Sequence, residues 1–271
     1  MLDLKILYKR DKLSKIVLTE TVVITVVSII QFCGIYPEYG GSKYDLFFLF
    51  SDKTVAYSFV MLLIIPIIGS LPYSDSYFVE NNLRYNIISK VGKKKYYFSK
   101  YLTCFITGFL NCLFVFELAY LFQILAININ GNVYCSNGAL NFDFLFPESY
   151  KVYFSNMIIN HPYLLVQIDI LFICLFSGTC GCLSYALSQV ISIKGLVYVN
   201  SFLVTFSISF ILQYVGMIGF LLAYFNVFRF STSLIETYPR DLTIVVICIL
   251  WIVFNVILAT IIQLVVDLKN E

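Results

Sequence analysis

Charged residues are scarce in this sequence, and histidine is almost absent. Of the 271 residues, 13% are charged and 60% are hydrophobic, and there is one histidine. Soluble domains usually carry about 25% charged and about 45–50% apolar residues. The composition therefore excludes an ordinary soluble domain and indicates an integral membrane protein. The formal net charge of +2 is too small to indicate a nucleic-acid partner.

Motifs of nucleotide hydrolysis and of metal binding are missing as well. No segment has the pattern G-x-x-x-x-G-K-[ST], so we expect no nucleotide hydrolysis on this chain. The only histidine, His161, lies beside Pro162 at a predicted membrane edge, which leaves little for a histidine-rich metal site or a Ser–His pair. We expect no catalytic residue, no metal site and no cofactor on this chain.

The eight cysteines do not form the pattern of a disulfide framework. Six of them lie inside apolar runs, where cysteine behaves as a small hydrophobic residue: Cys104, Cys112, Cys174, Cys180, Cys182 and Cys248. Cys33 and Cys135 fall near or in predicted external segments, and a bridge between these two stays open.

Long apolar runs dominate the rest of the chain, and a membrane-spanning helix needs about 20 such residues. We predict an all-α integral membrane protein, a single transmembrane domain over residues 1–271. Residues 1–15 alternate lysine or arginine with leucine and isoleucine, which predicts a helix along the membrane surface. Six spans follow: Ile16–Ile35, Val55–Leu71, Leu102–Ile127, Tyr163–Leu187, Leu196–Val215 and Leu242–Val266.

One apolar run is too long for a single span. Gly195–Phe228 has 34 residues without a charge. One helix of that length would measure about 50 Å, against a hydrocarbon core of about 30 Å. The run must therefore break, and Gly216 and Gly219 mark the place. We predict a re-entrant helical elbow at 216–241, between the fifth and sixth spans and on the outer side.

The distribution of positive charge predicts the orientation. The polar loop Pro72–Tyr101 lies between the second and third spans and is rich in lysine. Lysine and arginine close to a span stay on the cytoplasmic side. With this loop inside, thirteen of the 18 Lys and Arg residues fall in inner segments and five in outer ones. We therefore expect both termini in the cytoplasm.

Two acidic residues, Glu117 and Asp169, lie well inside predicted spans. Intramembrane acids are costly and often functional. No basic residue lies at the same predicted depth to pair with either of them. Two interpretations stay open: a structural role, with hydrogen bonds to polar residues of neighbouring helices, or a place on a substrate path.

The loop 72–101 has an internal order that suits a docking element. Pro72 with Ser74 or Asp75 can begin a helix, which Glu80 and Arg84 would support as an i, i+4 pair. A turn at Gly92 and the lysines 93–95 would follow. The loop could present a firm surface to a cytoplasmic partner, or contact only anionic lipid headgroups.

The segment Glu80–Lys100 resembles the first cytoplasmic loop of type-2 ATP-binding-cassette (ABC) permeases. The resemblance rests on an acidic residue, an Ile-Ser-Lys turn, a basic cluster and the sequence Tyr-Tyr-Phe-Ser-Lys before the third span. The layout of six spans, inner termini, surface helix and re-entrant elbow is also similar to that family, of the bacterial exporter type.

The resemblance implies a permease subunit of an ATP-driven exporter in the bacterial cytoplasmic membrane. Two permeases, identical or sister subunits, would sit on separate cytoplasmic ATPase chains that hold ATP and Mg. Segment 74–88 would be the coupling helix, with Phe78, Glu80, Leu83 and Arg84 contacting the ATPase. Substrates of such exporters are peptides, antibiotics or lipid-like molecules, and membrane lipid would be a further partner.

Two other function classes stay open from the sequence. The first is an ion-coupled secondary transporter that uses Glu117 and Asp169. Such folds usually contain internal repeats with matching broken helices, and the two halves of this chain show no matched breaks. The second is a membrane immunity or sensor subunit that binds a partner without transporting.

Overall fold

The computed structural model describes residues 64–80, 84–129, 157, 161–191, 193, 195–214 and 241–269, together with four helical residues of the first predicted span, Thr19, Val22, Val23 and Val26. Within these ranges every regular element is a helix. Several predicted features lie outside them: the surface helix 1–15, the two cysteines Cys33 and Cys135, most of the outer loop 128–162, and the elbow 216–241 apart from Asp241.

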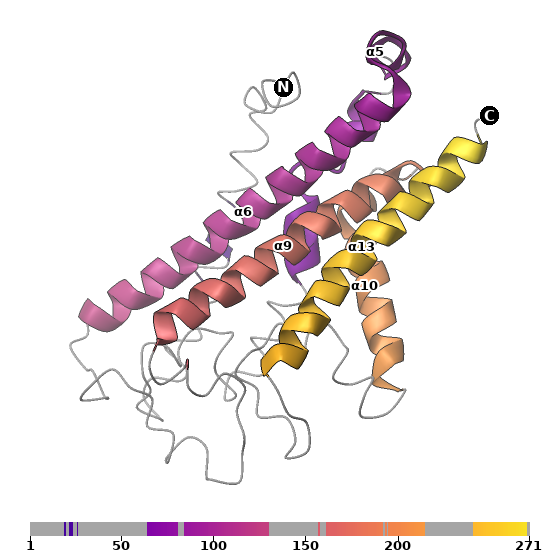
Figure 1. Cartoon of the computed structure of the whole chain (residues 1–271). Helices are drawn as coiled ribbons and strands as arrows, with labels where there is room; N and C mark the ends of the chain where they lie inside the picture. The colour runs from indigo at the N-terminus through magenta and orange to yellow at the C-terminus, as the bar shows by residue number, and fades with distance from the viewer. Residues whose placement is uncertain are drawn as a thin grey trace.

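The described residues form six helices with given bounds, and three of these are long and apolar enough to cross a membrane: α6, α9 and α13 (Figure 1). The fourth apolar helix, α10, is shorter. The prediction of an all-helical protein with apolar spans is confirmed for the described residues. The helices are α4 (Ser76–Val79), α5 (Arg84–Val91), α6 (Lys93–Ile129), α9 (Pro162–Ser188), α10 (Val197–Gln213) and α13 (Asp241–Lys269); residues 64–70 are also helical.

The predicted spans match these helices closely at most ends. The third span, predicted to begin at Leu102, differs most, because α6 already begins at Lys93. The additional turns are polar in sequence, and hydropathy alone cannot recognise them. They remain helical because Tyr96 and Lys100 are buried against the rest of the protein.

Helix α9 is the centre of the bundle. It contacts α6, α10 and α13, and in Figure 1 it lies between α6 and α13. Of its apolar span, 78% is buried inside the protein, compared with 44% for α6 and 22% for α13. The exposed apolar residues of α6 and α13 are therefore the surface that a bilayer would cover.

Backbones approach each other closely where helix 64–70, α6 and α9 meet. A Cβ atom placed on Gly69 would lie 2.0 Å from the carbonyl oxygen of Ser177. A Cβ atom on Gly108 or on Gly181 would lie 2.7 Å from the carbonyl oxygen of Gly69. Small residues allow this contact in membrane proteins, where close packing rather than the hydrophobic effect holds helices together.

Segments that the sequence predicts on one side of the membrane lie at one end of the described bundle. The start of α6 and the ends of α9 and α13 share this end (Figure 1). Lys93 forms an ion pair with Asp267, with 3.2 Å between nitrogen and oxygen. Gln189 donates a hydrogen bond of 2.6 Å to the side-chain oxygen of Gln263. The basic loop, the turn after α9 and the last turn of α13 are thus neighbours.

The glycine contact makes a direct prediction. We expect Gly69→Ala to lower the stability of the protein by about 1–3 kcal/mol, because the new methyl group overlaps a backbone carbonyl that cannot rotate away. Thermal unfolding of the detergent-purified protein measures the effect. Gly195→Ala is the matched control, since a Cβ atom there meets nothing within 4 Å. Equal melting temperatures for the two variants would contradict the packing described here.

Candidate functional site

The polar loop 72–101 folds into two short helices and the first turns of α6. We expected one helix over 74–88. Instead α4 ends at Val79, Glu80 is its C-cap with φ −96° and ψ 7°, and α5 begins at Arg84. The interruption lies at the residue whose carboxylate turns toward α6. The loop is therefore shaped by a contact with α6 as well as by local helix propensity.

A left-handed glycine joins α5 to α6. Gly92 has φ +88°, a conformation that residues with a side chain rarely adopt. Its backbone N–H donates to the carbonyl of Ile88, 2.8 Å away, which closes the last turn of α5. The turn predicted at Gly92 is confirmed, whereas lysines 93–95 belong to the first turn of α6 rather than to a loop.

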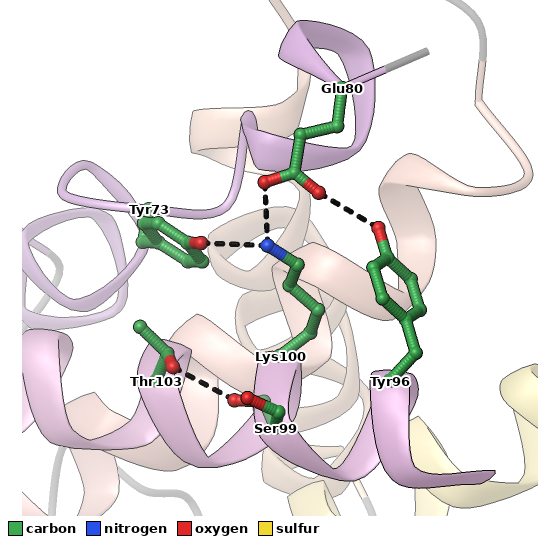
Figure 2. A network of polar contacts seen from close by, with 6 residues as sticks. All are labelled: Tyr73, Glu80, Tyr96, Ser99, Lys100 and Thr103. Carbon is green, nitrogen blue, oxygen red and sulfur yellow. Dashed lines mark hydrogen bonds and ion pairs between the residues drawn. The ribbon is translucent and has the colours of Figure 1, made fainter. Parts of the chain in front are cut away.

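The centre of the site is a buried ion pair between α6 and the residue that ends α4 (Figure 2). The ammonium of Lys100 lies 2.5 Å from Oε1 of Glu80 and donates a 2.9 Å hydrogen bond to the hydroxyl of Tyr73. The hydroxyl of Tyr96 donates to Oε2 of Glu80 at 2.9 Å. Lys100 is 1% exposed. Both oxygens of Glu80, whose side chain is 15% exposed, thus have a donor, as a charge largely removed from water requires.

The carboxylate of Glu80 is consequently used by contacts within the protein, although the residue as a whole is half-buried. We expected it to pair with Arg84 along one helix face, but its carboxylate is used by Lys100 and Tyr96. The guanidinium of Arg84 lies over the rings of Tyr77 and Tyr85 at 4.5 and 5.1 Å. Burial alone would lower the pKa of Arg84, but the two tyrosines raise it above its ordinary value, so the group stays charged.

The other two expected contact residues differ in position. Phe78 is half-buried, and its ring meets that of Tyr77 edge-on with 5.8 Å between centroids. Leu83 lies outside the described residues. Of these four residues, Phe78, Glu80 and Arg84 are half-buried, and Phe78 and Arg84 both contact Tyr77.

The second acid of the loop is also buried. Asp75 is 2% exposed and accepts a 2.9 Å hydrogen bond from the hydroxyl of Tyr198 on α10. Although Asp75 is the N-cap of α4, its side chain makes no capping hydrogen bond. Ser70 donates to the carbonyl of the same tyrosine at 2.5 Å. The loop is therefore tied to α10 as well as to α6.

These contacts place the acidic and the basic side chains of the loop on different sides. The two acids, Asp75 and Glu80, face inward, whereas four lysines are exposed: Lys90, Lys93, Lys94 and Lys95. Helix α5 has no buried residue. The outward surface of the loop is accordingly basic, with tyrosine and valine side chains between the lysines.

No family model, curated protein or solved structure matches this chain. The family expected from the resemblance therefore stays a prediction. It rests on the residues of the loop and on the layout of spans predicted from the sequence.

The two intramembrane acids are not brought together into one site. Glu117 on α6 accepts a 3.3 Å hydrogen bond from the amide of Gln167 on α9. Asp169 is 0% exposed, and neither of its carboxylate oxygens has a hydrogen-bond partner among the described residues. Glu117 thus joins two helices, while Asp169 is enclosed in the core of the described residues.

The six cysteines predicted to pack as small hydrophobic residues are all buried, and none of the six forms a disulfide. Four of them, Cys112, Cys174, Cys180 and Cys248, lie in the same core cluster. In the described part of the chain, no three residues of the His, Cys, Asp and Glu types gather as metal ligands.

Sequence reasoning missed Lys100 as the partner of Glu80. It also missed Tyr96 and Tyr198, which donate to Glu80 and Asp75, and Tyr73, which accepts from Lys100. One signal in the sequence indicated that Lys100 is buried. Tyr96, Thr103 and Cys104 lie three or four residues from Lys100 on the same face of α6, and all three are buried. A lysine on a buried face needs an acidic partner, and Glu80 and Asp75 are the acids of this loop.

We expect Lys100→Met to destabilise the protein by about 3 kcal/mol, because it leaves the carboxylate of Glu80 buried without its counter-ion. The double variant Glu80→Gln with Lys100→Met should recover a large part of this loss. Denaturation in detergent at neutral pH measures both. Lys93→Met is the matched control and should cost less than about 1 kcal/mol, since its ion pair with Asp267 is partly exposed. A double variant less stable than the single one would contradict the ion pair.

Proposed function

We propose that this chain is the membrane-spanning permease subunit of an ATP-driven exporter of the type-2 ATP-binding-cassette class. It would couple a separate cytoplasmic ATPase to the export of a peptide, antibiotic or lipid-like substrate. The observation that carries the proposal is the attachment of the α4–α5 loop to α6 through the buried pair of Glu80 and Lys100.

This attachment gives the loop the mechanical property that coupling requires. Helix α5 lies across the end of the bundle, seen nearly along its axis in Figure 1, while α6 extends through the full length. A displacement of α5 by a partner would reach α6 through the short Gly92 turn and through the ion pair. From α6 it would reach α9, because the two backbones are in contact at Gly108 and Gly178. A flexible loop would absorb the same displacement.

The outward face of α5 supports the same role. Tyr85 is 70% exposed on this helix. Tyrosine is enriched in protein interfaces relative to the rest of the surface, so its exposure here suits a binding face. Phe78 and Arg84 adjoin it through Tyr77. In the proposal, ATP binding closes a pair of ATPase chains and moves α4 and α5 toward the membrane. Glu80 transmits this movement rather than contacting the ATPase itself.

The proposal includes the predicted membrane arrangement. Six spans, two cytoplasmic termini and an external elbow would place the basic loop in the cytoplasm, where positive residues favour it. A second permease, identical or related, would complete the transport path. ATP and Mg would be held by the ATPase chains alone.

Photo-crosslinking at Tyr85 tests the partner. We expect p-benzoylphenylalanine at this position to form an adduct with an ATP-binding-cassette ATPase of the source organism when the two are co-expressed. Tyr214, at the end of α10, is the matched control because it is 77% exposed. Adducts from Tyr214 but none from Tyr85, or none with any such ATPase, would argue against the proposed function.

Cysteine labelling tests the orientation independently. In a background with Cys33→Ser and Cys135→Ser, we expect Lys94→Cys to react with a membrane-impermeant maleimide only after the cells are opened. The six described cysteines should stay silent because they are buried. Tyr214→Cys should react in intact cells. Labelling of Lys94→Cys in intact cells would place the basic loop outside and reject the proposed coupling.

A further inference from the structure

A stripe of exposed side chains on α6 changes from apolar to basic within two turns. Phe98, Leu102, Leu110 and Phe114 lie four or eight residues apart along this stripe, which winds around the helix, and they are 70%, 47%, 53% and 53% exposed. Lys94 precedes Phe98 by four residues in the same stripe, and Lys95 lies beside it. The apolar part would face lipid chains, and the stripe ends in two ammonium groups.

Contacts with α13 show how near these lysines are to the apolar zone. Tyr101 donates a 3.1 Å hydrogen bond to Gln263, and Lys93 pairs with Asp267, so the two helix ends lie at the same level. On α13, Ile261 and Leu264 are 50% and 58% exposed. Apolar surface therefore continues to Phe98, four residues or about 6 Å along the helix from Lys94. That distance is comparable to the headgroup layer, about 5–8 Å on each side of the hydrocarbon core.

Nothing in the described part of the chain neutralises Lys94 and Lys95. Lys93 is paired with Asp267, whereas the acids of the loop are used by other partners, Glu80 by Lys100 and Asp75 by Tyr198. The first turn of α6 contains no acidic residue. Lysines in the first turn of a helix oppose its dipole, so helix stability does not explain the presence of Lys94 and Lys95 there. Binding of an external anion would explain it.

We propose that Lys94 and Lys95, above Phe98, form a binding site for the phosphate headgroup of an anionic phospholipid. The ammonium groups would contact the phosphate, Phe98 would lie at the level of the ester groups, and the acyl chains would follow Leu102 and Leu110. Aromatic residues favour this interfacial level, and lysine stems bury along apolar surface while the charge stays wet. The lipid would hold the beginning of α6 at a fixed depth.

The stripe of exposed apolar side chains favours a lipid over a soluble protein as the occupant. A soluble partner could contact Lys94 and Lys95, but it could not follow the stripe through Leu102 to Phe114 in the middle of the span. Free phosphate would satisfy the lysines and leave Phe98 exposed to water. The proposal does not depend on the proposed function, since a lipid site of this kind would serve any membrane protein.

Quenching of tryptophan fluorescence by brominated lipids tests the site. The only tryptophan of the chain is Trp251, so Phe98→Trp in a Trp251→Phe background reports on one position. In nanodiscs we expect brominated phosphatidylglycerol to compete for this position roughly tenfold better than brominated phosphatidylcholine, an advantage that two lysines near a membrane surface can supply. Phe114→Trp in the same background is the control and should show no preference.

Lysine substitutions decide the cause of any preference. Lys94→Gln with Lys95→Gln should abolish the preference at Phe98→Trp, whereas Lys93→Gln should retain most of it. Equal quenching by the two lipids, or a preference that survives the double substitution, would overturn the proposal. Absence of quenching at Phe98→Trp by either lipid, with normal quenching at Phe114→Trp, would also overturn it and would indicate that protein covers this part of the stripe.

Discussion

The ion pair between Lys100 and Glu80 is the contact on which the shape of the loop depends. Moving two charges out of water costs several kcal/mol for each ion, and their attraction offsets this cost only when further hydrogen bonds satisfy both groups. Tyr73 and Tyr96 provide those bonds here. The pair therefore fixes the end of α4 against α6. Because α5 follows a few residues later and joins α6 at Gly92, its position is constrained from both sides.

This constraint has consequences beyond the loop because α6 is itself firmly packed. Its backbone meets α9 and helix 64–70 at glycines, where no side chain separates the chains. Asp75 adds a connection from the loop to α10 through Tyr198, and Lys93 adds one to α13. The four apolar helices α6, α9, α10 and α13 are thus linked, directly or through α6, to the end of the molecule that carries the loop. A force applied at that end would be distributed over the bundle rather than lost in one segment.

Sequence reasoning located α9, α10 and α13 within one to three residues at their described ends, because apolar composition is a strong signal for membrane helices. It placed the start of α6 nine residues too late, since the additional turns are polar and are buried by protein rather than by lipid. It also treated Glu80 as an outward contact. A pair between residues 80 and 100 requires the chain to fold back at Gly92. No local pattern specifies which acid a distant lysine will meet, so the direction of Glu80 could not be derived from spacing.

The arrangement of charge explains how one short loop could serve two kinds of contact. With Asp75 and Glu80 turned inward, their charges are compensated by internal donors and do not weaken the positive surface outside. Gly92 separates this positive surface into two parts, one on α5 and one on the first turn of α6. Helix α5 lies across the end of the bundle, where a protein can approach Tyr85, whereas Lys94 and Lys95 continue the lipid-facing side of α6. Burial of the acids thus stabilises the loop and also leaves both outer surfaces uniformly basic, which suits the cytoplasmic side of a membrane.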